Sequence, residues 1–228
     1  MNLPVIEPMG DTGLLVAWQG LTDQVALQHV QSLALAVRRS TIAGIVDVVP
    51  AFASLTIHYN PWQIGLREFE GSIRELISQM ELTVNLSNRS VEIAVCYDSE
   101  FALDLDEVSK LLGLSTREII RLQSDAQYVV QMIGFAPGFP YLAGLPQELC
   151  VARRGVPRFE VPAGSVAIGG KQTGIYSLAT PGGWQIIGRT PQRLFLPELD
   201  PPCLLQAGDR VRFVPVTRQE FYDWHART

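Results

Sequence analysis

Basic residues gather in one part of an otherwise acidic chain. The chain has 228 residues and a formal net charge of -5, yet the stretch from Val151 to Arg193 holds a single acid, Glu160. Its basic residues are Arg153, Arg154, Arg158, Lys171, Arg189 and Arg193. Guanidinium groups bind carboxylates and phosphates through paired hydrogen bonds, whereas a lysine acts as a point charge. The pattern predicts an anion site, although arginines that are solvated or paired with distant acids would explain the charge equally well.

Between residues 134 and 190, aromatic and hydroxyl side chains lie among most of the chain's 19 glycines. Glycine lets a ligand or a second strand approach the backbone closely. The residues that we expect to line a pocket or an interface are Phe135, Pro137, Phe139, Tyr141, Ser165, Thr173, Tyr176 and Trp184. Aromatic rings packed beneath Gly- and Pro-rich loops would leave the same pattern. The pair Gly182-Gly183 predicts a two-residue hairpin turn.

No residue of this segment is an obvious base or nucleophile. The histidines, His29, His58 and His225, all lie outside it. Their positions argue against a Ser-His-Asp triad and against a histidine-based metal site. Cys150 could be a nucleophile, but a small buried cysteine is the commoner case. We therefore expect no metal and leave the catalytic residues unassigned.

The run from Gly169 to Thr173 resembles a phosphate-binding loop only superficially. Such a loop requires Gly, four residues, Gly, Lys and then Ser or Thr. Here Ser165 stands in place of the first glycine and Gln172 follows the lysine. Nucleotide binding of the P-loop type is therefore not expected, and Lys171 remains an anion candidate on a β-turn.

The composition is that of a folded cytoplasmic protein. Hydrophobic residues make up 47% and charged residues 18% of the chain, which is ordinary for a globular domain. Cys96, Cys150 and Cys203 are odd in number and far apart, which predicts a reducing compartment and no disulfide framework. We expect no signal peptide and no membrane span. The negative charge argues against nonspecific binding to nucleic acid.

The first part of the chain predicts an α+β subdomain. Periodic apolar residues indicate strands, helices and a last strand in the order 14–19, 26–37, 45–49, 55–59, 66–80 and 91–95. This strand-helix-strand-strand-helix-strand order is typical of a ferredoxin-like fold. The last strand could instead open the next domain. We place the boundary so that residues 1–86 form the first domain and residues 87–228 the second.

The second part of the chain predicts two short helices followed by a β structure. Asp104 and Gly113 are expected to bound one helix, and Ser115 with Glu118 forms a capping box for the next. Short apolar runs then alternate with Gly and Pro at 128–133, 159–161, 166–168, 184–187, 194–196, 203–205 and 211–214. Such short strands with frequent turns predict a closed or sandwich-like sheet. Residues 221–228 are expected to form a short helix or a tail.

Several motifs of the glycine-rich segment resemble the family of the B subunit of 5-oxoprolinase. They are Gly134-Phe135-x-Pro137-Gly138-Phe139-x-Tyr141-Leu142, Val161-Pro162-Ala163-Gly164-Ser165-Val166, Thr173-Gly174-Ile175-Tyr176 and Pro181-Gly182-Gly183-Trp184 with Ile187-Gly188-Arg189-Thr190. The family also includes an inhibitor of a sporulation histidine kinase and the first half of the carboxyltransferase-like region of urea carboxylase. Together the motifs are specific, and the resemblance covers nearly the whole chain.

The resemblance implies a ferredoxin-like N-terminal subdomain followed by a cyclophilin-like β-barrel. It also implies a direct partner, the C subunit of 5-oxoprolinase, and a functional partner, the A subunit of the same enzyme. The family's assembly opens 5-oxoproline to L-glutamate with ATP, which this chain need not bind itself. We hypothesise that the chain contributes part of a shared site and is inactive alone. The residues that could hold a carboxylate or phosphate there are Arg153, Arg154, Arg158, Lys171 and Arg189.

Two other functions stay open at this point. As an inhibitor of a histidine kinase, the chain would expose its aromatic residues as anchors, since aromatic residues dominate protein interfaces. As a subunit of a urea- or allophanate-type amidohydrolase, it would act on a related compound. The family commonly has histidine where Gln123 stands, and proline at Ala94, Ala152 and Ser177. Loss of that histidine weakens any acid-base role carried over to this position.

Overall fold

The computed structural model describes residues 3–80, 82 and 89–225, and the chain divides into two compact units, Met1–Leu86 and Ser87–Thr228. Each unit has its own hydrophobic core. All three cysteines are free thiols. Across the described residues, none of the helices combines the length and the apolar character needed to traverse a membrane.

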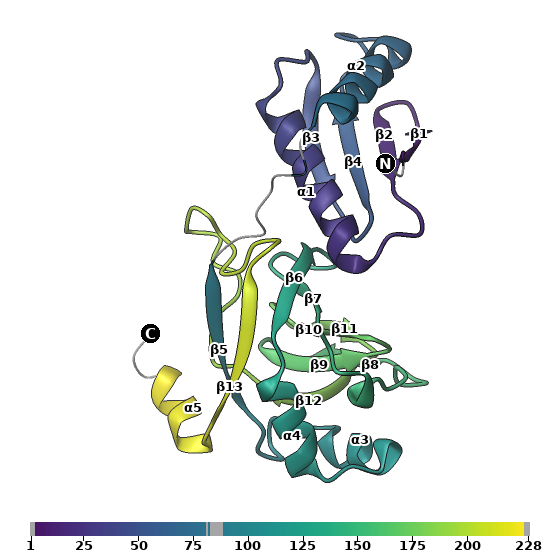
Figure 1. Cartoon of the computed structure of the whole chain (residues 1–228). Coiled ribbons are helices and arrows are strands. Elements are labelled where there is room, and N and C mark those ends of the chain that lie inside the picture. Colours follow the sequence, from purple (N-terminus) through teal and green to yellow (C-terminus); the bar gives the residue numbers. More distant parts are fainter. Residues whose placement is uncertain (1–2, 81, 83–88, 226–228) are drawn as a thin grey trace. The chain divides into compact units, whose positions relative to one another are not determined.

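The first unit is an antiparallel sheet covered on one face by two helices (Figure 1). The strands follow the order β1-β2-β4-β3 and are β1 (Val5–Met9), β2 (Gly13–Ala17), β3 (Ile45–Pro50) and β4 (Ser54–Tyr59). The helices are α1 (Asp23–Arg39) and α2 (Leu66–Gln79). Alternate residues of β2 and β4 point into the core, and α2 adds Phe69, Ile73 and Ile77 at helical spacing.

One strand predicted for this sheet lies elsewhere. β5 (Ser90–Cys96) belongs to the second unit, so the alternative in which residues 91–95 open the next domain is correct. The fourth strand of the sheet is β1, which pairs with β2 and was not predicted. β1 is an edge strand whose residues are mostly exposed, so it lacks the apolar alternation that marks a half-buried strand. A ferredoxin-like fold stays a prediction for this unit.

The second unit is built on a closed barrel, which confirms a β-barrel in the second part of the chain. Its strands close in the order β10-β7-β6-β13-β5-β12-β9. Besides β5, they are β6 (Tyr128–Ile133), β7 (Pro140–Ala143), β9 (Ser165–Gly169), β10 (Gln172–Ile175), β12 (Gln185–Arg189) and β13 (Arg210–Val216). β5 and β13 are parallel, and the other pairs are antiparallel. Ile93, Tyr128 and Phe213 are among the residues that fill the core.

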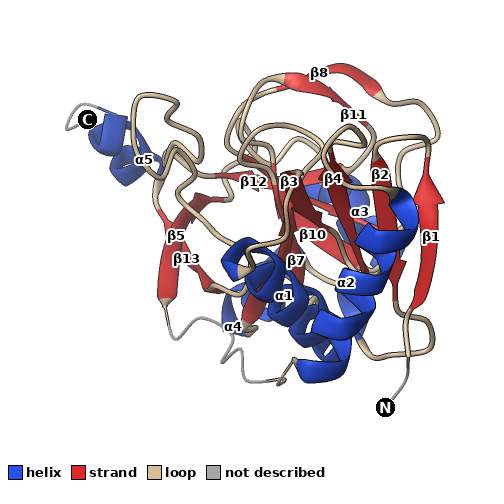
Figure 2. Ribbon diagram, turned by 90° about the horizontal axis from the view of Figure 1, so that it is seen from above, coloured by secondary structure: helices blue, strands red, loops and turns tan. Residues whose placement is uncertain are grey.

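A two-stranded ribbon of β8 (Arg158–Val161) and β11 (Thr180–Gly182) is paired separately from the barrel (Figure 2). The predicted hairpin at Gly182-Gly183 is therefore wrong: β11 pairs with β8, while β12 pairs with β9 and β5. The runs 194–196 and 203–205 form only an isolated bridge between Phe195 and Cys203. The Gly-Gly pair thus leads the chain from the ribbon into the barrel.

Helices α3 (Leu105–Leu112) and α4 (Thr116–Asp125) lie together at one end of the barrel (Figure 1). Gly113 ends α3 in the left-handed conformation with φ of 67°, and the Ser115 hydroxyl accepts a hydrogen bond from the Glu118 backbone at 3.1 Å. The predicted end of α3 is confirmed, and so is the Ser115 half of the predicted capping box, while the Glu118 carboxylate accepts hydrogen bonds from Arg121. The remaining helices are η1 (Gln147–Leu149) and α5 (Arg218–His225). Part of the predicted C-terminal element, 226–228, lies outside the described residues.

Candidate functional site

A pocket of about 210 Å³ opens in the second unit between the barrel and the loops that precede β8. Its lining residues are Phe135, Phe139, Tyr141, Arg153, Arg154, Pro157, Tyr176, Gly182, Gly183 and Trp184. Five of them are aromatic and two are cationic, and the lining contains no carboxylate, histidine or cysteine. The pocket therefore combines flat apolar walls with positive charge, and its lining offers no ordinary base.

The aromatic wall is a network of rings around Phe139. Its ring centroid lies 4.9 Å from that of Tyr141, 5.3 Å from those of Phe135 and Tyr176, and 5.7 Å from that of Trp184. The pairs with Phe135, Tyr176 and Trp184 are edge-to-face, an arrangement that aromatic rings favour. Phe139 is buried, whereas Phe135 is 61% exposed at the edge of the network. The rings hold one another in place and leave one aromatic side chain accessible.

Glycines make room for these rings. A Cβ atom on Gly169 would lie 2.7 Å from the Trp184 indole, and a Cβ atom on Gly174 would lie 2.9 Å from the Phe139 ring. Both distances are too short for a real side chain. The glycine spacing of the sequence is thus explained by aromatic side chains packed directly on strands β9 and β10.

Phe135 has an unusual backbone conformation. Its φ of 71° makes it the one non-glycine residue with positive φ in the described ranges. A bulky residue rarely adopts this conformation because its Cβ atom crowds the backbone. Strained residues of this kind cluster at binding sites, where the surrounding structure holds them. Here the strain presents a largely exposed ring beside the pocket.

Arg153 supplies a positive charge that no carboxylate neutralises. Its guanidinium carbon lies 5.5 Å from the centroid of the Trp184 ring, within range of a cation-π interaction. In the part of the chain that the structure describes, no acid lies within ion-pair distance of Arg153. The side chain is exposed, so its hydrogen-bond donors face solvent at the pocket. Arg153 is therefore the residue best placed to meet an anionic ligand.

Arg154 and Arg158 are paired with a buried acid. Asp104, 2% exposed, accepts hydrogen bonds from Arg154 Nη1 at 2.8 Å and from Arg158 Nη1 and Nη2 at 2.8 and 2.6 Å. Glu107 lies 3.5 Å from Arg154. The interpretation in which distant acids pair with the arginines thus holds for these two residues, while Arg154 also lines the pocket.

Asp104 was predicted only as the start of a helix. It does occupy the residue before α3, but its side chain makes no capping hydrogen bond there. The sequence contains no local signal for its ion pairs, because its partners lie 50 and 54 residues further along the chain. Only the closure of the barrel brings these residues together.

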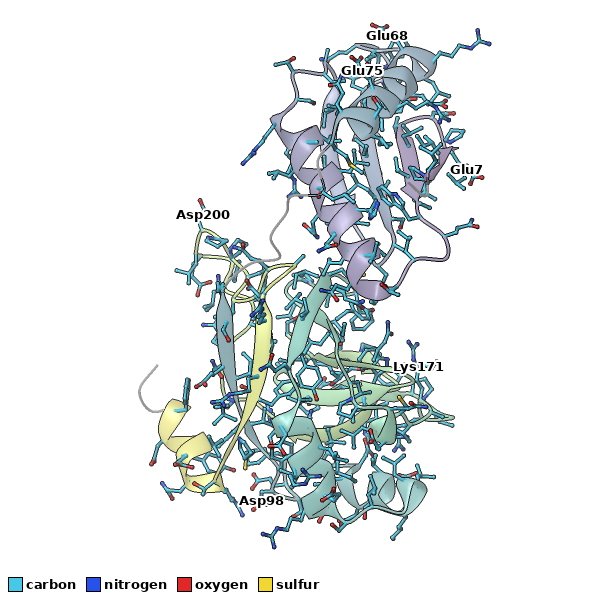
Figure 3. All side chains as sticks on the ribbon, viewed as in Figure 1. Glu7, Glu68, Glu75, Asp98, Lys171 and Asp200 are labelled. Carbon is cyan, nitrogen blue, oxygen red and sulfur yellow. The ribbon has the colours of Figure 1, made fainter. Side chains whose placement is uncertain are left out.

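Two predicted cations lie away from the pocket. Lys171 is exposed in the turn between β9 and β10 and is labelled in Figure 3. Arg189 is held by a hydrogen bond from its Nε to the Ala163 carbonyl oxygen at 2.8 Å. Neither contributes to the lining, so the candidate anion site reduces to Arg153 and Arg154, with Arg158 behind them.

The remaining predicted pocket residues have structural contacts instead. The Ser165 hydroxyl donates to the Pro162 carbonyl at 2.7 Å, and the Thr173 hydroxyl donates to the Ala167 carbonyl at 2.9 Å. The Pro137 carbonyl accepts a hydrogen bond from Ser177 at 2.6 Å. None of these residues lines the pocket.

Gln123, at the position where histidine was expected, is also remote from the lining. It is fully buried on α4, and its side-chain amide has no hydrogen-bond partner among the described residues. The Tyr128 hydroxyl donates to its backbone carbonyl at 3.1 Å. A role in acid-base chemistry at the pocket therefore finds no support in its location.

The two phenols of the pocket stay neutral near pH 7. Burial raises the pKa of Tyr141, and the positive charge of Arg153 opposes that rise. Burial also raises the pKa of Tyr176, opposed by a hydrogen bond from the Trp184 backbone and by Arg153. Neutral phenols can donate hydrogen bonds to a ligand oxygen or accept them from a ligand N–H.

Within the described residues no group of His, Cys, Asp and Glu has the arrangement of a metal site.

The chain is similar to known proteins over most of its length. A profile of the carboxyltransferase domain, subdomain C and D, matches residues 4–205. The chain is 38% identical to the B subunit of 5-oxoprolinase from Bacillus subtilis (strain 168) over 227 residues, which cover 95% of both chains. It is 44% identical to the B subunit of 5-oxoprolinase from Escherichia coli O157:H7 over 182 residues, covering 79% of this chain and 83% of that one.

The fold is also similar to that of a solved structure. The crystal structure of TTHA0988 superposes with a TM-score of 0.79 at 35% identity. It covers 90% of this chain, which spans only 40% of the length of TTHA0988. Because sequence identity, the matched domain and the fold agree over most of its length, the chain belongs to the family of 5-oxoprolinase B subunits.

Proposed function

We propose that the chain is the component of an ATP-dependent 5-oxoprolinase complex that binds 5-oxoproline, in the pocket walled by Phe139, Tyr176 and Trp184. The observation that carries the proposal is the Arg153 guanidinium, which lies over Trp184 beside the aromatic walls and is not neutralised by any acid in the described residues. The names of the relatives support the reaction, and the pocket supports the role of this chain in it.

The ligand chemistry matches the pocket in three respects. 5-oxoproline is a flat five-membered lactam that carries a carboxylate, so aromatic faces can enclose the ring while a guanidinium binds the carboxylate. The phenols of Tyr141 and Tyr176 can hydrogen-bond to the lactam C=O and N–H. At about 210 Å³ the pocket is smaller than the roughly 300–1,000 Å³ typical of sites for drug-sized molecules. It therefore suits a small metabolite.

Ring opening needs more than this pocket supplies. Hydrolysis breaks the lactam C–N bond, adds the hydroxyl of water to the carbonyl carbon and leaves a proton on the nitrogen. The lining residues include no carboxylate or histidine to activate the water. In the proposal, two companion chains supply what is missing: the C subunit, which completes the site, and the A subunit, which couples it to ATP. The chain alone has no turnover.

Binding of matched ligands tests the proposal. 5-oxoproline, 2-pyrrolidinone (which lacks the carboxylate) and proline (which lacks the lactam carbonyl) are titrated by calorimetry into the chain and into its complex with a co-expressed C subunit. We expect 5-oxoproline to bind most tightly. Arg153→Gln should weaken its binding about 10- to 100-fold, the loss expected for a hydrogen bond to a charged group. The matched control Lys171→Gln removes one positive charge outside the pocket and should have no effect.

Reconstitution tests the reaction itself. With the A and C subunits present, ATP hydrolysis should depend on both this chain and 5-oxoproline, and at low substrate concentration it should fall about 10- to 100-fold when Arg153→Gln replaces the wild-type chain. Failure of 5-oxoproline to bind either preparation would overturn the proposed ligand. Turnover of 5-oxoproline by the chain without companions would overturn its role as an incomplete component.

A further inference from the structure

We infer that Asp104 is a positioning residue for the pocket: it fixes Arg154 in the pocket wall, Arg158 beside it, and strand β12, which begins directly after Trp184. This inference rests on the proposed function. Asp104 is the one residue that joins α3, the arginines before and within β8, and strand β12 by hydrogen bonds in the described structure. It touches no part of the pocket lining other than Arg154.

Both oxygens of the Asp104 carboxylate are fully used within the protein. Oδ1 accepts from Arg154 Nη1 at 2.8 Å and from Arg158 Nη2 at 2.6 Å. Oδ2 accepts from Arg158 Nη1 at 2.8 Å and from the Ile186 backbone N–H at 2.7 Å. A carboxylate offers about four acceptor positions, so none remains for a substrate or a proton. Asp104 therefore acts on other residues and takes no part as a base.

The same residue fixes the strand beneath the aromatic wall. The Asp104 backbone N–H donates to the Ile186 carbonyl at 2.8 Å, while its side chain accepts from the N–H of that residue. Ile186 follows Trp184 by two positions, and Trp184 is the ring over which Arg153 lies. The Arg154 backbone N–H in turn donates to the Gly183 carbonyl at 2.8 Å. The buried Asp104 side chain thus connects Arg154 in the cationic wall to the strand that follows Trp184 in the aromatic wall.

The charges explain why a buried carboxylate is needed at that point. Arg153, Arg154 and Arg158 lie within six residues of one another, and two of them meet at Asp104. Asp104 and Glu107 carry two negative charges against three guanidinium groups, so positive charge remains for a ligand after the arginines are fixed. Arg154 is held on its Nη1 side, and its Nε has no partner among the described residues.

Asp104→Asn gives a test in which charge and position predict opposite results. The substitution keeps the size of the side chain but removes one negative charge beside the pocket. If charge alone governs binding, affinity for 5-oxoproline rises. If Asp104 positions the wall, affinity falls at least 10-fold although the region has become more positive, and affinity for uncharged 2-pyrrolidinone falls less because the carboxylate contact is the one disturbed.

Asp209→Asn is the matched control. Asp209 is 1% exposed, accepts a hydrogen bond from the Gln206 backbone at 2.9 Å and lies 3.6 Å from Arg89 Nε, but it is absent from the pocket lining. Its substitution removes the same charge from an equally buried site, so the affinity for 5-oxoproline should not change. Equal losses in both variants, or unchanged or higher affinity in Asp104→Asn, would overturn the inference.

A second measurement keeps the inference testable without a ligand. Arginine side-chain N–H signals of the free protein are recorded by NMR and assigned with Arg154→Lys and Arg158→Lys. Held guanidinium groups give resolved signals that exchange slowly with water, and both should be lost in Asp104→Asn and kept in Asp209→Asn. If wild type binds no 5-oxoproline, the proposed function fails while this result still decides the role of Asp104. Unchanged signals in Asp104→Asn would refute that role.

Discussion

The two units each contain a small pocket beside a tryptophan, and the arginines at these pockets are held in different ways. The pocket of the first unit, about 150 Å³, is lined mainly by apolar residues together with Trp18, His29 and Arg74. Arg74 pairs with Glu70 one helical turn away, and their side chains are 55% and 32% exposed. At the barrel pocket, Arg154 pairs with a carboxylate that is almost completely buried.

The burial of the acidic partner determines whether an arginine beside a pocket is fixed in position. An exposed pair on one helix is screened by water and leaves both side chains mobile. A buried carboxylate with several hydrogen bonds fixes its partners, because any other arrangement would leave a charge unpaired inside the protein. The barrel pocket therefore has cations in defined positions, whereas the pocket of the first unit is an apolar hollow beside a surface ion pair.

The largest expected effect comes from removing the buried carboxylate. Asp104→Ala should lower the free energy of unfolding by about 3–5 kcal/mol, because two guanidinium groups and the Ile186 N–H lose their acceptor. Urea unfolding of the chain, followed by circular dichroism, measures the loss. Glu107→Ala is the control, since Glu107 is 60% exposed and contacts the same Arg154 at 3.5 Å. Similar values for both variants would remove the contrast between buried and exposed pairs.

The next largest loss of stability is expected at Gly182, and the adjacent Gly183 serves as its control. A Cβ atom on Gly182 would collide with the Tyr176 hydroxyl, so Gly182→Ala must displace a wall of the pocket and should cost about 1–3 kcal/mol of stability. On Gly183 the added carbon would meet Pro157 at an ordinary distance of 3.6 Å, so Gly183→Ala should cost much less. Calorimetric unfolding and 5-oxoproline binding measure both variants, and equal results would contradict the packing described for the pocket.

Removing a buried phenol hydroxyl should change the free energy of unfolding by about 1 kcal/mol. The Tyr97 hydroxyl is buried without a hydrogen-bond partner in the described structure, so Tyr97→Phe should raise the free energy of unfolding by about that amount at pH 8. Unfolding in urea at several pH values measures it. A lower stability of Tyr97→Phe at pH 8 would show that the hydroxyl has a partner.

The same measurements have a defined pH dependence. Burial raises the pKa of Tyr97 and Tyr128 above the usual value, so the unfolded chain loses these protons first. The stabilisation that comes from this difference in protonation is complete below the unfolded pKa of about 10, and it is lost as the pH rises above that value. The advantage of Tyr97→Phe should therefore grow above pH 10. A constant advantage up to pH 11 would contradict the burial of this phenol.

The smallest effect is expected at the first unit's ion pair. Glu70→Gln should change the free energy of unfolding by less than about 0.5 kcal/mol, because Arg74 and Glu70 form an exposed pair one helical turn apart. The change should shrink further in 0.5 M salt. A loss comparable to that of Asp104→Ala would mean that exposure does not distinguish the two arginines.

Local chemistry made much of the fold predictable. Gly113 ends α3 and Ser115 begins α4 because the residues that cap helices act on their immediate neighbours. Short apolar runs separated by Gly and Pro predicted a closed or sandwich-like sheet, and the structure has a closed barrel. What failed involved the choice of partner strand: β1 is an exposed edge strand, β5 pairs with β13 far along the chain, and the Gly182-Gly183 pair connects two different sheets.

The candidate site also has a part that the sequence predicts and a part that it does not. The aromatic walls could be predicted because the glycines of β9 and β10 that accommodate the rings belong to the same part of the sequence. The role of each cation could not, because it depends on contacts across the barrel. Asp104 meets arginines 50 and 54 residues away, whereas Arg189 and Lys171 lie outside the pocket.

The location of bound 5-oxoproline decides whether the aromatic pocket of the barrel is the binding site. A crystal structure of the chain or of its complex with the C subunit, whichever binds 5-oxoproline, should show the lactam against Trp184 and Tyr176, with its carboxylate within hydrogen-bond distance of Arg153. Ligand found in the apolar pocket of the first unit, or an aromatic pocket that stays unoccupied at saturating 5-oxoproline, would contradict the account.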